Sequence, residues 1–373
     1  MQDTDKVFDV CVRGTGVVAH SLALALSRQG LAVALQVAPP RQNVSGDVRA
    51  YALNLSSVSL LDELKVWQAL PGDARTAVYD MRVQGDGAAG MLRFSAWQQQ
   101  VRELAWIVDV AALEAELAAA VRYAPHVTMI ASAAKARLLV LAEGKASATR
   151  DELGVAFEHH DYEQMAVAAR LSTDLAHGGL ARQWFQAPAV LALLPMDRPQ
   201  PGHGLALVWS LPADRAREVL AWPDAEVEAA LMTATAGEAG QLRLASPRAA
   251  WPLALARAER VHGPGWVLVG DAAHVVHPLA GQGLNLGLGD VQALTRVLAG
   301  REPWRDLADD RLLQRYARER ALPVQAMATL TDGLLRLFAH PSPWVRELRN
   351  RGLGLVDAAV PFKRWLGARA LGQ

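Results

Sequence analysis

The segment that most constrains the fold of this chain is residues 266–289, WVLVGDAAHVVHPLAGQGLNLGLG. It begins with an apolar run that ends at Gly270-Asp271, which predicts a buried strand with a carboxylate at its C-terminal edge. After a loop, Gly281-Gln282-Gly283 begins a glycine-rich helix, although each glycine inside a helix costs roughly 1 kcal/mol relative to alanine. We therefore expect a ligand to approach this backbone closely. A carboxylate beside a helix N-terminus suits a polyhydroxylated, anionic cofactor.

A second glycine-containing segment lies near the N-terminus. A predicted strand at 7–12 is followed by a glycine turn and a helix, and a second predicted strand covers 31–37. The turn residues that match the fingerprint of a dinucleotide-binding fold are Gly14, Gly16 and Ala19. The acid that normally ends the second strand and binds a ribose is absent, because this strand ends in Gln36-Val37. The sequence therefore disfavours a simple NAD dehydrogenase.

Two arginines in this region have more than one interpretation. Arg13 replaces the apolar residue expected at the end of the first strand, and it either reaches a phosphate or bends outward. Arg49, in the segment DVRAYALN (47–54), either pairs with phosphate beside a nucleotide crevice or is a surface residue before a helix. That helix is expected to begin near Ser56 or Ser57, either of which can cap its N-terminus.

The remaining chain changes character along its length. Residues 81–94 alternate weakly around Gly85-Asp86-Gly87, which predicts a hairpin. The further predicted strands are 127–130, 137–141, 166–173, 189–194 and 205–211, and the predicted helices are 111–123 and about 224–236. The proline-punctuated strands between 157 and 252 indicate a mostly antiparallel domain inserted into the first. Beyond 290 we expect helices broken at prolines, among them Pro303 and Pro323.

Composition excludes several classes of protein. A chain of 373 residues can bury two or three cores, and its 38 basic residues balance 38 acids, which gives no overall field that would attract nucleic acid. The single cysteine, Cys11, cannot form an intrachain disulfide, which favours a reducing compartment. We find no export signal and no apolar stretch approaching the roughly 20 residues of a membrane span. These features predict a cytoplasmic protein, with the alternative of one lying on the cytoplasmic face of a membrane.

His274 and His277 are three residues apart and could be read as metal ligands. No carboxylate or cysteine accompanies them at a recognised spacing, so we expect no metal site. We expect both histidines to shape the loop before the glycine-rich helix.

The segment Gly270-Asp271-Ala272-Ala273-His274 resembles the GD motif of the group A FAD-dependent aromatic hydroxylases, which share the p-hydroxybenzoate hydroxylase-like fold. The surrounding sequence is similar to the branch that hydroxylates ubiquinone precursors. The further matches span nearly the whole chain. They are the N-terminal glycines, DVRAYALN at 47–54, LALLPM at 191–196, LVWSLP at 207–212, Pro278, Gly281-Gln282-Gly283, Asn285, Asp290, TDGLLRLF at 331–338, LRNRGLGLVD at 348–357 and the closing ALG at 370–372. The resemblance implies an α/β fold with a Rossmann-like FAD-binding domain, an inserted, mainly antiparallel β-sheet substrate domain and a helical C-terminal segment.

The same resemblance divides the chain into domains. The FAD-binding domain is expected to comprise 1–78, 101–156 and 259–320, the substrate domain 79–100 and 157–258, and the C-terminal helices 321–373.

The resemblance also implies the chemistry. NAD(P)H reduces the FAD, O2 adds to the reduced flavin, and the resulting C4a-hydroperoxide hydroxylates an aromatic ring, with a ubiquinone (polyprenyl phenol) precursor as the expected substrate. No side-chain nucleophile is required, so no catalytic residue is assigned, although His277, Pro278 and Leu279 are expected near the flavin ring. The residues expected to bind the cofactor are Gly14, Gly16, Ala19, Arg49, Glu143, Gly144, Gly270, Asp271, Pro278, Gly281, Gln282, Gly283, Leu284 and Asn285.

Two departures from the family pattern keep an alternative open. The missing acid at Gln36-Val37 removes a charged hydrogen bond to the adenosine half, of roughly 1.5–3 kcal/mol, and Glu143-Gly144 stands where the family has Asp-Gly. Both changes predict weakened FAD binding. The alternative function is therefore a catalytically impaired family member that binds flavin weakly and acts as an accessory protein in quinone biosynthesis.

The C-terminal stretch 336–369 holds seven basic residues against two acids, interspersed with apolar residues. A basic amphipathic tail can lie on anionic lipid, which would suit a polyprenylated substrate and contact with pathway partners. The alternative is a solvated helical cap on the first domain.

Overall fold

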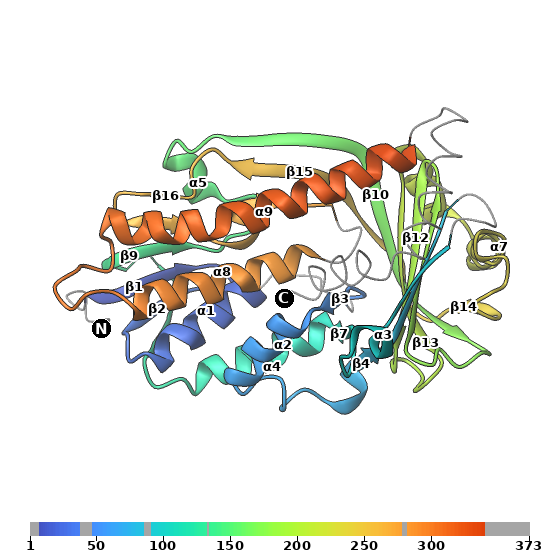
Figure 1. Cartoon of the computed structure of the whole chain (residues 1–373), viewed down its shortest axis with the longest axis horizontal. Coiled ribbons are helices and arrows are strands. Elements are labelled where there is room, and N and C mark those ends of the chain that lie inside the picture. Colours follow the sequence, from blue (N-terminus) through green and yellow to red (C-terminus); the bar gives the residue numbers. More distant parts are fainter. Residues whose placement is uncertain (1–6, 38–46, 86–90, 133, 278–281, 340–373) are drawn as a thin grey trace.

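The structure is a computed structural model of the chain, and it describes residues 7–37, 47–85, 91–132, 134–277 and 282–339, without the side chains of 334–339. A layered α/β part carries the first strands and helices, and an antiparallel sheet stands beside it (Figure 1). The long helix α9 (Asp310–Ala339) runs along both parts. The predicted basic stretch lies almost entirely outside the described residues.

A parallel sheet forms the centre of the α/β part, with strand order β16-β17-β9-β1-β2-β8. Its strands are Phe8–Arg13 (β1), Val33–Gln36 (β2), Val127–Ile130 (β8), Ala136–Leu141 (β9), His262–Gly263 (β16) and Trp266–Leu268 (β17). All neighbouring pairs are parallel except β16–β17. The carboxyl ends of β1, β2, β9 and β17 therefore meet at one edge, where ligands bind in open α/β sheets. The Rossmann-like prediction is confirmed.

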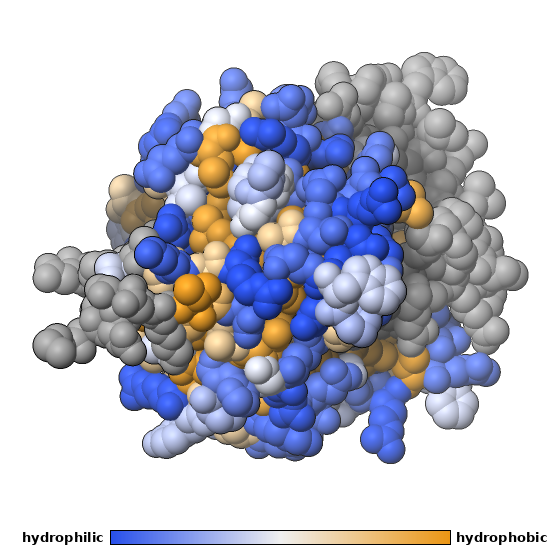
Figure 2. All heavy atoms as spheres, turned by 90° about the vertical axis from the view of Figure 1, so that its left-hand side faces the viewer, coloured by the Kyte–Doolittle hydropathy of each residue, from blue (hydrophilic) through white to orange (hydrophobic). Residues whose placement is uncertain are grey.

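Helices cover one face of this sheet and enclose the main core. They include Val17–Arg28 (α1), Leu55–Glu63 (α2), Val110–Arg122 (α4) and Gln282–Ala299 (α8), and the start of α9 joins them. Leu22 and Leu26 of α1 and Leu288 of α8 are completely buried. Burial of each such side chain contributes about 1.5–3 kcal/mol. The outer surface at this end of the molecule mixes hydrophilic and apolar side chains (Figure 2).

A small antiparallel sheet, β3-β7-β4, packs against both the α/β part and the large antiparallel sheet (Figure 1). Its strands are Ala50–Leu53 (β3), Arg75–Val78 (β4) and Ala105–Asp109 (β7), and Gly72–Ala74 (η1) precedes β4. The prediction that Ser56 or Ser57 caps α2 is wrong. Asn54 is the N-cap, because its backbone is extended and its side chain accepts a hydrogen bond from the Ser57 N–H at 2.8 Å.

The second large sheet is mainly antiparallel, in the order β18-β15-β10-β13-β12-β11-β5-β6, with β14 paired to β10. Its strands are Asp80–Gln84 (β5), Met91–Ser95 (β6), Phe157–Thr173 (β10), Leu180–Gln186 (β11), Ala189–Met196 (β12), Gly204–Pro212 (β13), Leu242–Leu244 (β14), Ala249–Ala258 (β15) and His274–Val275 (β18). The helices Ala213–Ala221 (α6) and Asp224–Thr235 (α7) contribute to its core. The short helices Ala96–Gln99 (α3) and Ala148–Glu152 (α5) complete the described elements between β6 and β10. The predicted hairpin forms as β5–β6, and most of its turn lies outside the described residues.

Strand β10 contains a bulge where its register with β15 shifts between Asp161 and Gln164. Within the bulge, Glu163 has a φ of +55°, and its N–H donates to the Asp161 side chain at 2.8 Å. A non-glycine residue in the left-handed region is strained, and such bulges redirect side chains.

The prediction that Pro323 breaks the C-terminal helices is wrong, because α9 continues through it. Contacts on both sides hold the helix: the Tyr316 hydroxyl donates to the Leu268 carbonyl, and Asp332 accepts from Tyr162. The predicted domain division at 320/321 falls inside this helix, and the division into domains remains a prediction. Within the described part of the chain, no helix is long and apolar enough to cross a bilayer.

Candidate functional site at the carboxyl edge of the parallel sheet

Strand β17 leads directly into the GD loop, Gly270–Ala272 (η2). Gly270 has a φ of +61°, a conformation that favours glycine. Asp271 is exposed to solvent, yet desolvation by the surrounding protein raises the pKa of its carboxyl despite the opposing charges of Lys145 and Arg49. A carboxylate that is surrounded by protein but reachable by solvent is suited to contact a polar ligand.

Asp290, on α8, holds this loop through a buried hydrogen bond. Its carboxylate is completely buried and accepts hydrogen bonds from Gly270 N–H (2.7 Å), His274 Nε2 (2.8 Å) and Arg320 Nε (2.6 Å). Burial alone would raise its pKa, but His274, Arg320 and the Gly270 N–H together hold the pKa below the ordinary aspartate value. One buried anion therefore joins the GD loop, α8 and α9.

The first turn of α8 contains the predicted residues Gln282, Gly283, Leu284 and Asn285. The Asn285 side chain accepts from the Asn54 N–H (3.0 Å) and the Ser57 hydroxyl (2.7 Å), and it donates to the Ala52 carbonyl (2.8 Å). It therefore ties α8 to β3 and α2. A cofactor contact by Asn285 remains a prediction.

The fold requires glycine at some positions of the site and not at others. A Cβ on Gly14 would lie 2.2 Å from the Ala142 carbonyl oxygen, and one on Gly287 would lie 2.7 Å from Val18 Cγ2. Packing of the chain therefore requires these two. A Cβ on Gly16 or Gly283 would meet no atom of the described residues within 4 Å, and neither residue has a positive φ. The fold does not require glycine at these two positions, and each leaves open space at the start of α1 or α8.

Glu143 and Gly144 follow β9 at the same edge, and Gly144 has a φ of +79°. The Glu143 carboxylate accepts from the Ser147 hydroxyl (2.6 Å) and from the Thr149 hydroxyl (2.8 Å) and N–H (3.3 Å). It thus stabilises its own loop and the start of α5. Arg13 extends to the same place, where it donates to the Thr149 hydroxyl at 2.9 Å. A contact from Glu143 to the cofactor remains a prediction.

The end of β2 has an unusual polar group. The side-chain oxygen Oε1 of Gln36 is buried and has no hydrogen-bond partner in the described structure. Gln36 lies in register with Arg13 of β1, whose buried Nε also lacks a partner there. Val37 packs against the main core. A buried polar atom without a hydrogen-bond partner costs free energy, so a ligand that bonds to Gln36 Oε1 or Arg13 Nε would be stabilised here.

Arg49 lies just before β3, paired rather than free. Its guanidinium binds Asp47 bidentately, at 2.9 Å from Nε and 2.5 Å from the second nitrogen, and donates to the Tyr51 hydroxyl at 3.2 Å. Glu114 lies 3.7 Å away. The hydrogen bond that Arg49 donates to the Asp47 carboxylate raises the pKa of Arg49 above its ordinary value. Arg49 also acts electrostatically on Asp271, which brings the two predicted residues into one neighbourhood.

His277 is the last described residue before the start of α8, and it is completely buried. Burial lowers its pKa to about 4, so the imidazole is neutral, and neither ring nitrogen has a partner in the described structure. Its ring packs edge-on against Tyr162 of the β10 bulge, with centroids 5.2 Å apart, and the Tyr162 hydroxyl donates to Asp332 at 3.3 Å. The predictions for Pro278, Leu279 and Gly281 fall outside the described residues.

The edge thus collects the predicted residues of four segments: Gly14, Gly16 and Ala19 at the start of α1, Glu143 and Gly144 after β9, Gly270 and Asp271 in η2, and Gln282 to Asn285 in α8. Sequence reasoning missed Asn54 as a cap, Arg320 and Tyr162. Arg320 and Tyr162 carry no local signal for the site, because the site residues that they contact, Asp290 and His277, are distant in the chain. Among the described residues, no group of three or more histidine, cysteine or acidic side chains could hold a metal ion.

Comparison with known proteins identifies the family. A family model described as an FAD binding domain matches residues 120–331. The chain is 30% identical to "Ubiquinone hydroxylase UbiL" of Rhodospirillum rubrum, over 99% of this chain and 90% of that protein. The chain belongs to this family of FAD-dependent monooxygenases. Among its members, "3-demethoxyubiquinol 3-hydroxylase" of Escherichia coli is 28% identical over 99% of this chain and all of that protein.

Solved structures agree on the fold. PqsL of Pseudomonas aeruginosa, described as a probable FAD-dependent monooxygenase, has a TM-score of 0.76 at 20% identity, over 93% of this chain and 99% of that one. HpxO of Klebsiella pneumoniae, solved with FAD and uric acid, has a TM-score of 0.72 at 17% identity, over 97% of each chain. FAD is thus the cofactor of the family, and NAD(P)H is its typical co-substrate. Which residues of this chain bind FAD remains a prediction.

Proposed function

We propose that this family member hydroxylates the aromatic ring of a ubiquinone precursor, a polyprenyl phenol, with NAD(P)H and O2 as co-substrates. The observation that carries the proposal is the pair of glycines, Gly16 and Gly283, that open onto space the fold does not need. They lie at the starts of α1 and α8, and the exposed Asp271 lies in η2, which packs against α8. The curated relatives named as ubiquinone hydroxylases cover nearly the whole chain and support the choice of substrate.

The residues present fit an extended dinucleotide. Gly16 is the N-cap of α1 and provides no side-chain cap, so the N–H groups of that helix start are available to a pyrophosphate. Asp271 would accept from ribityl hydroxyls, and Arg49 would face the phosphates or ribityl chain. The start of α8, next to Gly283, would offer the positive end of a helix dipole to the negative charge of reduced flavin.

When bound, FAD supplies the redox and oxygen chemistry of the hydroxylation. The chain contributes orientation and exclusion of water. Asp290 holds the GD loop through its hydrogen bond with the Gly270 N–H. The neutral, fully buried His277 and its contact with Tyr162 would exclude charge and water from the segment that precedes α8.

The test is direct. We expect the purified protein to be yellow or to become so with added FAD, and to oxidise NAD(P)H in the presence of O2 and a polyprenyl phenol with gain of one oxygen atom in the product by mass spectrometry. A colourless protein that stays inactive with added FAD would overturn this function and favour the accessory role.

We further propose that the protein acts in the cytoplasm and contacts the membrane surface peripherally, where it would also meet pathway partners. The basic, apolar composition of 336–369 supports this. We expect co-sedimentation with vesicles containing anionic lipid but not with neutral vesicles. Equal binding to both, or binding to neither, would contradict it.

A further inference from the structure

Arg170 is a buried arginine at the junction of the two sheets that contain β10 and β3. It lies on β10, and only 7% of its surface is exposed. Its guanidinium donates to the Arg49 carbonyl at 2.6 Å, pairs with Asp109 at 3.3 Å and contacts the Met196 sulfur. One side chain of the antiparallel sheet therefore contacts the main chain of a residue predicted to bind the cofactor.

The charge of Arg170 is not explained by stability. Burial lowers its pKa, and the nearby Asp109 only partly opposes this effect. Asp109 is also occupied as the N-cap of α4, where it accepts from the Ala112 N–H at 3.0 Å. Well-packed apolar residues often replace buried ion pairs without loss of stability. The contacts of this guanidinium, rather than a gain in stability, are therefore the feature to be explained.

The element that Arg170 positions is the Arg49 backbone. Besides Arg170, the Arg49 carbonyl accepts only a long bond from the Val110 N–H, 3.4 Å, within the described structure. The Arg49 side chain is in turn fixed by Asp47 and Tyr51, and both Arg49 and Tyr51 interact electrostatically with Asp271. A shift of this carbonyl would move the whole group relative to Asp271.

We propose that Arg170 is a positioning residue for FAD binding, and that it acts through Arg49 by holding the Arg49 carbonyl from the antiparallel sheet. This inference rests on the proposed cofactor contact of Arg49. It makes FAD affinity sensitive to the position of β10, the strand that also bears the bulge at Tyr162.

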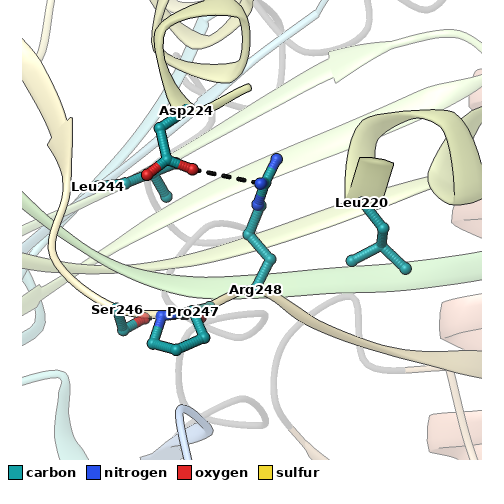
Figure 3. Close-up of a pocket in the computed structure, with 6 residues that line it drawn as sticks. All are labelled: Leu220, Asp224, Leu244, Ser246, Pro247 and Arg248. Carbon is teal, nitrogen blue, oxygen red and sulfur yellow. Dashed lines mark hydrogen bonds and ion pairs between the residues drawn. The ribbon is translucent and has the colours of Figure 1, made fainter. Parts of the chain in front are cut away.

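The chain offers a matched control in Arg248. Its guanidinium likewise donates to main-chain carbonyls, those of Val219 and Trp222 at 2.8 Å each, and pairs with Asp224 at 3.2 Å. It lines a pocket formed by the ends of α6 and α7 and the segment after β14 (Figure 3). None of these partners belongs to the predicted cofactor site.

The experiment compares R49M, R170M, the double variant R49M/R170M and the control R248M. The FAD dissociation constant of the apoprotein is measured by flavin fluorescence titration, and the free energy of unfolding by urea. We expect R49M and R170M each to weaken FAD binding by roughly tenfold. The double variant should bind FAD no more weakly than R49M does, because the two residues act through one contact. R248M should lose stability without loss of FAD affinity. If R170M does not fold, R170K takes its place, since it keeps the charge but loses the planar fork, and we expect a several-fold weakening.

Three results would overturn the inference. If R170M or R170K binds FAD with wild-type affinity while R49M binds it more weakly, the role of Arg170 is refuted and the cofactor contact of Arg49 is not. Losses that add in the double variant show that Arg170 does not act through Arg49, and equal weakening in R248M shows a general effect of destabilisation. Unchanged affinity in R49M instead refutes the proposed cofactor contact itself.

Discussion

The two ends of the predicted cofactor site are built differently. At the GD end, Asp290 is satisfied by three donors from the chain, and Asn285 by contacts from β3 and α2. At the adenosine end, the Gln36 oxygen has no partner in the described structure, and the Glu143 carboxylate turns back onto its own loop. The first end is organised by the protein alone. The second leaves a buried polar atom without a partner among the described residues, so stability and FAD affinity should respond differently at the two ends.

The largest effect is expected from D290A. It leaves Arg320 and His274 buried without their anion, which costs about 3–5 kcal/mol of unfolding free energy. Urea unfolding measures this loss. The control is D224A, whose carboxylate is 71% exposed beside Arg248 and should cost less than about 1 kcal/mol. Equal losses would show that the GD end is not specially organised.

The next effect is a pH dependence from His277. Its folded pKa of about 4 lies below the usual histidine value of about 6.5, so the unfolded chain binds a proton that the folded protein does not between these values. Stability should therefore fall as pH drops from about 6.5 to about 4, by about 3 kcal/mol. We expect H277F to lack this component in urea unfolding at several pH values. An unchanged pH profile in H277F would exclude His277 as its source.

G283A is expected to raise the stability of the FAD-free protein and to lower its affinity for FAD. In the FAD-free protein the alanine meets no neighbour among the described residues and improves the helix, so the unfolding free energy should rise by about 0.5–1 kcal/mol. FAD binding should weaken by about tenfold or more, measured by fluorescence titration. The control G287A should instead destabilise the FAD-free protein, because its Cβ would lie 2.7 Å from Val18. Unchanged FAD affinity in G283A would remove the cofactor from the start of α8.

The smallest effect is expected at the other end, from Q36E. A carboxylate at this position, beside Arg13 in register, would supply the acid that the end of β2 lacks. We expect FAD binding to tighten by about fivefold, about 1 kcal/mol at the scale of one net hydrogen bond. Q36L serves as the matched variant without an acceptor. If Q36E and Q36L bind FAD equally, Gln36 does not face the ribose.

The features that sequence alone predicted have local causes. Apolar runs followed by glycine or a carboxylate identified β1, β9 and β17, and the glycines at 14, 16, 270 and 283 marked the edge where these strands end. The family resemblance then supplied the arrangement of the sheets, which the fold confirms.

The errors came from competition between local preference and distant contacts. Three residues near one another could cap α2, and the extended backbone at Asn54 decided among them. Pro323 removes one hydrogen bond, but α9 is anchored before and after it, so the helix persists. The partners of Asp290 include Arg320, and no spacing rule connects an acid to a cation on another helix.

The position of Arg320 has a consequence for how the protein matures during synthesis. The GD loop and α8 leave the ribosome before Arg320 does, so Asp290 lacks its cation until much of α9 has been made. Burial of an anion without its partner is strongly unfavourable. We therefore expect the GD loop to reach its final form late in translation, after β1, α1 and β9 have been synthesised, so that loading of the cofactor would follow the folding of the earlier strands.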